Sequence, residues 1–245
     1  MGSNDAKTKE SQRKHVRYEV SDDCRIRASI MIRSSDPASA NKDWSGVLVD
    51  MSAEGAHIQI SLGAVAYKGD NCVLTLSHGG VKLPLRGSLA HYVCSARHSM
   101  CGVKFDFQSA GADRSYQPFF KAVVASSTLK GGTTDSDMPG RYREEYSGPG
   151  HTKLVVWRDN KPERALVGFD YTMARYAAAL ASAGADMFKN KAEVGFRAAP
   201  TESGVPGAPL TPSQEAEARW EFSIAASNLP KSIAQDIRRL LRLVS

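Results

Sequence analysis

The chain has 245 residues, of which 42% are hydrophobic and 24% charged, so it has enough apolar material for one large or two modest domains and is not wholly disordered or fibrous. Its net charge of +6 suggests an anionic partner of unspecified class, and its four cysteines do not make a disulfide framework. The longest near-apolar run, Tyr176–Ala185, is too short to span a membrane, and the charged N-terminus is unlike a signal peptide. We therefore expect a soluble, cytoplasmic protein.

The first half of the chain has the pattern of short strands. Residues 1–12 are polar and predict a flexible arm. Apolar residues then alternate with polar ones in six segments, a density that favours a six-stranded antiparallel barrel, and residues 113–127 predict a following helix. The expected strands are Cys24–Ile30, Trp44–Met51, Ala56–Ser61, Asn71–Leu76, Val81–Val93 and Cys101–Phe107.

A Gly-, Thr- and Ser-rich stretch at residues 131–150 predicts a linker, which leaves residues 151–245 as a smaller α+β domain. Its terminal helix, Ser232–Val244, has an apolar face and an arginine-bearing polar face; we favour a core helix over one that docks a partner or lies on a membrane. The other expected elements are strands at Lys153–Arg158, Ala165–Tyr171 and Trp220–Ala226, a helix at Met173–Phe188, a loop at Ala199–Ser213, and Pro230 in the first turn of the terminal helix.

Two short motifs flank the beginning of the predicted barrel. Arg13 and Arg17 form an RxxxR pair before the first strand, and Asp50, Ser52 and Gly55 form a DxSxxG motif at the end of the second. With the later strand Met100–Phe105, this order resembles the PilZ family of bacterial receptors for cyclic di-GMP. The resemblance covers about residues 12–127, and we place the domain at residues 13–130. No family is recognised for residues 151–245.

The residue types suit a ligand with two phosphodiesters and two guanines. Arginine binds phosphate oxygens or the O6/N7 edge of guanine through a planar fork that lysine lacks. A carboxylate such as Asp50 can accept from guanine N1 and N2, Ser52 lies on the same strand face, and Gly55 permits a positive φ or a close approach of the backbone to the ligand. The expected ligand-binding residues are Arg13, Arg17, Asp50, Ser52 and Gly55, with Gln12 and Lys14 as weaker candidates.

Other interpretations of these patterns are weaker. RxxxR alone is typical of solvated basic arms, and DxSxxG alone is an ordinary turn signal. His91, Cys94, His98 and Cys101 have zinc-like spacing, but residues three apart on a regular strand face opposite sides, and we interpret residues 95–99 as a hairpin turn. No motif for catalysis is present, so we expect that the protein is not an enzyme and that it binds neither a metal nor a cofactor.

The expected function is that of a cyclic di-GMP receptor, which converts ligand binding into altered interdomain geometry or partner binding. The resemblance implies control of motility, exopolysaccharide or biofilm, with a protein partner reached through the C-terminal domain. The alternative is a ligand-independent interaction scaffold. Residues 7–17 hold five cations against Glu10 alone, and this compact charge favours a small dinucleotide over a nucleic-acid polymer.

Overall fold

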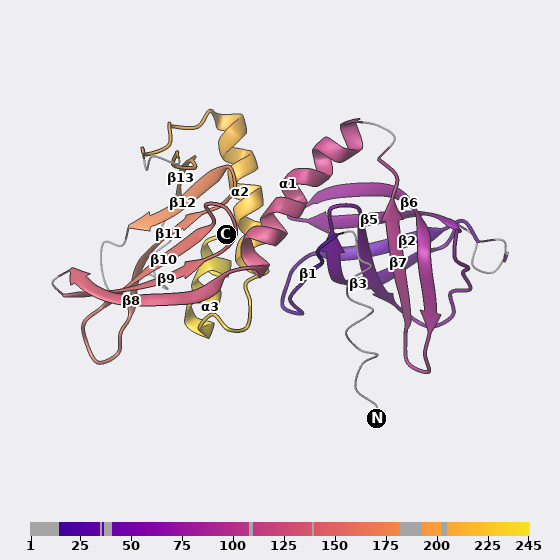
Figure 1. Ribbon diagram of the computed structural model, residues 1–245, viewed down its shortest axis with the longest axis horizontal. Coiled ribbons are helices and arrows are strands. Elements are labelled where there is room, and N and C mark those ends of the chain that lie inside the picture. Colours follow the sequence, from indigo (N-terminus) through magenta and orange to yellow (C-terminus); the bar gives the residue numbers. More distant parts are fainter. Residues whose placement is uncertain are drawn as a thin grey trace, which may run out of the picture. The chain divides into compact units, whose positions relative to one another are not determined.

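The computed structural model describes residues 15–34, 36, 41–107, 110–138, 140–181, 193–201 and 205–245. The chain divides into two compact units (Figure 1). The second unit contains the described residues of Val20–Ile26, Ser77–Lys82 and Arg114–Ser245, and the first contains the other described residues. Each unit is therefore assembled from segments that are distant in the sequence.

The first unit is built on a seven-stranded antiparallel sheet with the order β1-β3-β2-β5-β6-β7-β4. An additional pairing of β3 with β4 closes six of these strands into a barrel, as the sequence predicted. The seventh strand, the two-residue β1, pairs with β3 near its C-terminal end. The helix α1 (Ala110–Ser127) follows the barrel. The strands are β1 (Tyr18–Glu19), β2 (Arg27–Ile32), β3 (Asp43–Ser52), β4 (Gly55–Ile60), β5 (Asn71–His78), β6 (Val81–Cys94) and β7 (Ser99–Phe105).

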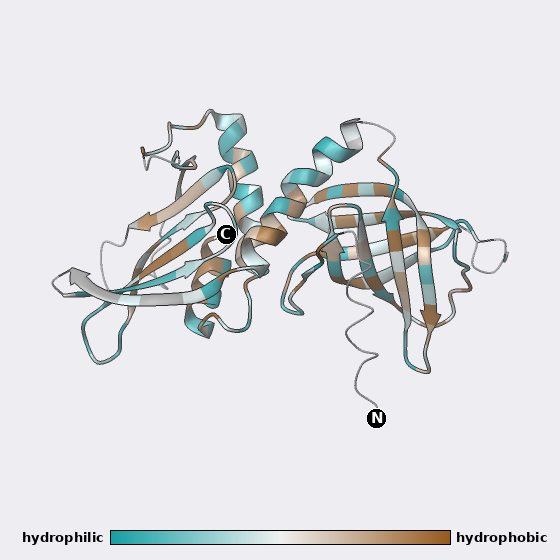
Figure 2. Ribbon diagram, viewed as in Figure 1, coloured by the Kyte–Doolittle hydropathy of each residue, from teal (hydrophilic) through white to brown (hydrophobic). Residues whose placement is uncertain are grey.

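The barrel core follows from the alternation of apolar and polar residues along each strand. In β4, Ala56, Ile58 and Ile60 are buried, whereas His57 and Gln59 between them are only partly buried. Alternate bands of hydropathy along the barrel strands show the same pattern (Figure 2). Since successive side chains of a strand point to opposite faces, the apolar set fills the barrel and the polar set covers its outside.

The second unit contains a six-stranded antiparallel sheet with the order β13-β12-β11-β10-β9-β8. Its two C-terminal helices are α2 (Pro212–Ser227), which begins with a capping box between Thr211 and Gln214, and α3 (Gln235–Val244). The strands are β8 (Lys130–Met138), β9 (Arg141–Ser147), β10 (Lys153–Asp159), β11 (Leu166–Thr172), β12 (Tyr176–Ala181) and β13 (Gly195–Ala198).

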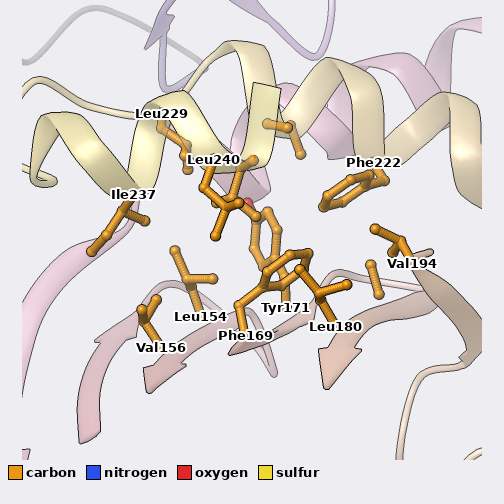
Figure 3. Packing of buried hydrophobic residues seen from close by; sticks show 14 of the residues in the cluster. Leu154, Val156, Phe169, Tyr171, Leu180, Val194, Phe222, Leu229, Ile237 and Leu240 are labelled. Carbon is orange, nitrogen blue, oxygen red and sulfur yellow. The ribbon is translucent and has the colours of Figure 1, made fainter. Parts of the chain in front are cut away.

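One hydrophobic cluster joins the sheet of the second unit to α2 and α3 (Figure 3). Phe222 of α2 is completely buried, and its ring stacks on Phe169 with centroids 5.9 Å apart. Tyr171 and Phe196 meet the same ring edge-on. Leu240 of α3 lies in the same cluster. Burial of these large side chains accounts for the packing of both helices against the sheet.

The structure corrects four sequence-based expectations in this unit. Residues 131–150 were expected to form a linker but largely form β8 and β9, because their backbones pair with each other and with β10. The alanine-rich segment expected as a helix at Met173–Phe188 begins with strand β12, whose Tyr176 and Ala178 pack into the core; residues 182–188 lie outside the described residues. Trp220–Ala226 is helical within α2, and Pro230 precedes α3, which has Ala234 as its N-cap.

The segment Val20–Ile26 packs against the C-terminal helices of the second unit. The Ser21 amide donates to Asn228 Oδ1 at 2.8 Å, and the Cys24 thiol lies 3.3 Å from Ser227 Oγ. Asp23 accepts from Arg238 at 3.0 Å and from Arg242 at 3.2 Å, both on α3. The chain immediately after β1 is thus tied to α3 by charge and by hydrogen bonds.

Candidate functional site

Two β-bulges turn polar side chains to the outside of the barrel. In β3 the pairing with β4 shifts between Leu48 and Asp50, and in β6 the pairing with β7 shifts between Leu89 and His91. Leu48 and Leu89 are buried in the barrel. Residues two apart on a regular strand share a face, so the extra residue in each bulge is what directs Asp50 and His91 outward.

Arg17 is held beside Asp50 by the short strand that follows it. Tyr18 and Glu19 pair with Met51 and Asp50, so the chain enters β1 directly opposite the end of β3. Arg17 Nη1 donates to Asp50 Oδ1 at 2.9 Å. The Asp50 side chain is 17% exposed and that of Arg17 is 34% exposed, so this ion pair is only partly accessible to water.

His57 completes the contact on the neighbouring strand. It pairs with Asp50 across β3 and β4, and its Nδ1 lies 2.8 Å from Asp50 Oδ2. Its Nε2 lies 2.7 Å from Arg17 Nη1. Arg17 Nη1 also contacts Nδ1 of the same ring, so His57 lies against both the guanidinium and the carboxylate. Each oxygen of Asp50 therefore has a partner within the domain.

These neighbours set the charge state of Asp50. Burial by itself would raise its pKa, but the hydrogen bond from His57 and the charge of Arg17 outweigh burial and hold the pKa below the ordinary value of 3.8. Asp50 is thus an anion at neutral pH. Each oxygen of this anion keeps a second lone pair, so Asp50 can accept hydrogen bonds from a ligand beside its contacts with Arg17 and His57 or in exchange for them.

Ser52 and Gly55 form the turn between β3 and β4. The Ser52 hydroxyl donates to the Gly55 carbonyl at 3.4 Å. Gly55 does not have the positive φ that the sequence analysis allowed for. Its Cα instead faces β7, where an added Cβ would lie 2.4 Å from the Val103 carbonyl oxygen. In the structure, glycine is required here because the backbone of the neighbouring strand β7 leaves no space for a side chain.

A second imidazole lies next to the Asp50 contact. His57 and His91 both pair with Gly102, from opposite sides of β7. Since Gly102 has no side chain, the two rings meet above it with centroids 4.7 Å apart in an edge-to-face arrangement. An added Cβ at Gly102 would lie 2.1 Å from His91 Cε1. Asp50, His57, Gly102 and His91 therefore form a continuous row across four strands.

The structure brings together Arg17, Asp50, Ser52 and Gly55 of the expected site. Gln12, Arg13 and Lys14 lie outside the described residues. His15 lies 3.2 Å from Glu54, so the chain two residues before Arg17 lies beside the DxSxxG turn. Sequence analysis missed His57 as a member of this site, although its alternation with Ala56 and Ile58 placed it on the outer face.

The zinc-like spacing is not a cluster in space. Tyr92 and Cys101 are paired, and Cys101 is buried inside the barrel, whereas His91 points outward and Cys94 is exposed. Ser95 Oγ accepts from the His98 amide, and the Ser95 amide donates to the His98 carbonyl, which confirms the predicted hairpin turn. Among the described residues, no group of three or more His, Cys, Asp or Glu side chains is arranged to hold a metal ion.

Comparison with known families assigns this half of the chain. Residues 11–119 match the PilZ domain, in agreement with the resemblance carried by the two motifs, and the rest of the chain is unassigned. No curated protein matches the chain. In the part of the chain that the structure describes, no helix is long and apolar enough to cross a membrane.

Proposed function

We propose that this chain, which contains a PilZ domain at residues 11–119, is a receptor for cyclic di-GMP and not an enzyme. The observation that carries the proposal is the contact of Arg17 with Asp50 at the end of β3, with Ser52 and Gly55 in the adjoining turn. Ligand recognition needs no cofactor in this arrangement. The site offers one cation and one anion side by side, which suits the phosphodiesters and the guanine edges of one ligand.

Binding exchanges contacts that the free protein makes with itself. Arg13 and Arg17 grip phosphate and the O6/N7 edge of guanine, and Asp50 accepts from N1 and N2 of guanine. Ser52 contributes a hydroxyl to the same face, and Gly55 keeps the turn close to the barrel. Gln12 and Lys14 add weaker contacts from the arm. A hydrogen bond to a charged group contributes about 1.5–3 kcal/mol net of the hydrogen bonds to water that it replaces.

The effect of ligand binding is transmitted through the chain segment that follows Arg17. Arg17 is separated by three residues from Ser21, which begins the contacts with α2, α3 and the turn between them. Movement of Arg17 toward the ligand pulls on this segment and changes the contacts of Asp23 with Arg238 and Arg242. The output is a change in interdomain geometry or in the affinity for a protein partner of the C-terminal region. The controlled process is motility, exopolysaccharide production or biofilm formation.

Titration calorimetry of the full chain with cyclic di-GMP tests the receptor function. The wild-type protein should bind, and Arg17→Lys should weaken binding at least about tenfold, since a point charge cannot replace the planar fork. The matched control is Arg97→Lys, which changes an exposed arginine on the Ser95–Ser99 turn of the same barrel. This variant should bind like the wild type.

Absence of binding heat for the wild-type protein, together with no ligand-induced change in its melting temperature, would refute the proposal. A protein complex that forms equally well with and without cyclic di-GMP would instead favour the ligand-independent scaffold. Equal affinities of Arg17→Lys and the wild type would remove Arg17 from the site.

A further inference from the structure

His91 is the one side chain of the row on the outer barrel face that makes no hydrogen bond within the Asp50 contact. Its ring is half-buried on the backbone of Gly102 and touches His57 edge-on. Among the described residues, no hydrogen bond to its ring nitrogens is observed. A polar ring fixed in place by packing, with free nitrogens, is available to a ligand.

The row is long enough for a dinucleotide. Asp50, His57, Gly102 and His91 lie on β3, β4, β7 and β6 in succession. Neighbouring strands are about 4.8 Å apart, so a ligand that contacts Asp50 with one base and extends across the sheet reaches β6. The missing side chain at Gly102 lets the two imidazoles lie against each other along this path.

We propose that His91 is a further binding residue for cyclic di-GMP, and that its imidazole takes up a proton when the ligand binds. This inference rests on the receptor function proposed above. The bound ligand carries two phosphodiester charges, which stabilise an imidazolium next to them. The protonated ring donates from both nitrogens, and it therefore contacts phosphate or guanine oxygens better than the neutral ring.

The surroundings of His91 make the free ring neutral. Burial lowers its pKa below the ordinary value of 6.5, and the neighbouring His57 of β4 and Arg17 of the arm lower it further. Asp50 of β3 acts in the opposite direction but is weaker. On β7 the facing residue is Gly102, which carries no charge. The charge of the ligand reverses this balance, so binding and protonation support each other.

The affinity for cyclic di-GMP should rise as the pH falls, because binding takes up a proton. At pH 8 the free and the bound ring are both largely neutral, and the affinity lacks the contribution of the imidazolium. As the pH falls, the bound form gains its proton before the free form does, and the affinity rises by up to about tenfold per pH unit for one proton. The gain ends below the pKa of the free ring, where both forms are protonated.

Calorimetric titrations of the full chain with cyclic di-GMP at pH 6 and pH 8, in pairs of buffers with different ionisation enthalpies, test this inference. The wild type should bind about tenfold more tightly at pH 6 and take up more protons on binding than His91→Gln, which should lose most of this pH dependence. Gly102→Ala keeps the imidazole but forces it away from β7, and it should also lose the effect. His98→Gln changes a histidine of the same hairpin and should behave as the wild type.

The outcomes separate the two proposals. A wild-type protein that does not bind refutes the receptor function. A wild-type protein that binds, while His91→Gln keeps the same affinity and the same pH dependence, overturns only the role of His91. Far-ultraviolet circular dichroism and melting temperature confirm that each variant is folded, so that a lost effect is assigned to the site.

Discussion

The ion pair of Arg17 with Asp50 should contribute measurably to the stability of the barrel even without ligand. We expect a coupling free energy of about 1 kcal/mol between the two side chains in a double-mutant cycle with Arg17→Ala, Asp50→Ala and the double variant. The expectation follows from the 2.9 Å contact and from the exposure of the partners, 34% for Arg17 and 17% for Asp50.

The magnitude lies between two limits. Exposed ion pairs contribute about 0.2–1 kcal/mol, because water screens them and long side chains lose freedom. At an effective dielectric constant of about 20, unit charges about 4 Å apart attract by about 4 kcal/mol before the cost of desolvation. A pair with one partner mostly buried, at 17% exposure, and the other one-third exposed therefore lies near the upper end of the exposed range. Asp50→Ala alone should cost more than Arg17→Ala alone, about 2 against 1 kcal/mol, since it also removes the hydrogen bond of His57.

Native-state hydrogen exchange in urea is the appropriate measurement, because it reports the opening free energy amide by amide. Amides in the paired strands β3 and β4 report on the barrel alone. The matched control is Arg97→Ala on the exposed hairpin turn of the barrel, which should change the unfolding free energy by less than about 0.5 kcal/mol.

The pH dependence fixes the sign of the effect. The pKa of Asp50 is lowered in the folded chain, so its stabilising contribution is complete above 3.8 and is lost as the pH falls from there through the folded-state pKa. Coupling below about 0.3 kcal/mol at pH 7, or coupling already absent at pH 5, would refute this account of the pair.

Two further predictions concern the second unit. Phe222→Ala should lower its unfolding free energy by about 4 kcal/mol in urea denaturation, because the buried ring packs on three aromatic neighbours. The control Leu243→Ala, at an exposed position of α3, should lower it by less than about 0.5 kcal/mol. A loss below about 2 kcal/mol for Phe222→Ala would contradict the packing shown in Figure 3. Burial lowers the pKa of His78, whose Nε2 lies 2.8 Å from Ser223 Oγ. As the pH falls, the unfolded chain therefore binds a proton at this residue before the folded chain does. The unfolding free energy should decrease from about pH 6.5 toward the folded-state pKa, by at most about 1.4 kcal/mol per pH unit. His78→Asn should remove this decrease in urea midpoints between pH 7.5 and 5.5, and an equal decrease in the variant would assign the effect to another group.

The sequence predicted the barrel better than the second unit because the two carry different kinds of signal. In the barrel, alternating residues such as Ala56, His57 and Ile58 specify which face is buried without reference to any other strand. In the second unit, the alanines of Tyr176–Ala181 favour a helix locally, and only the pairing with β11 and β13 makes this segment a strand. Trp220 and Phe222 were assigned to a strand although they belong to a capped helix.

The sequence alone predicted the candidate site, because Arg17, Asp50, Ser52 and Gly55 occur in a recognisable order and spacing. It also determined that this half of the chain forms a short-stranded barrel. Only the tertiary structure placed His57 beside Asp50 and His91 beside His57, because two bulges and the bare backbone of Gly102 depend on strand register. The attachment of the segment Val20–Ile26 to α3 was likewise decided in three dimensions, since Asp23 and Arg238 are distant along the chain and meet only after folding.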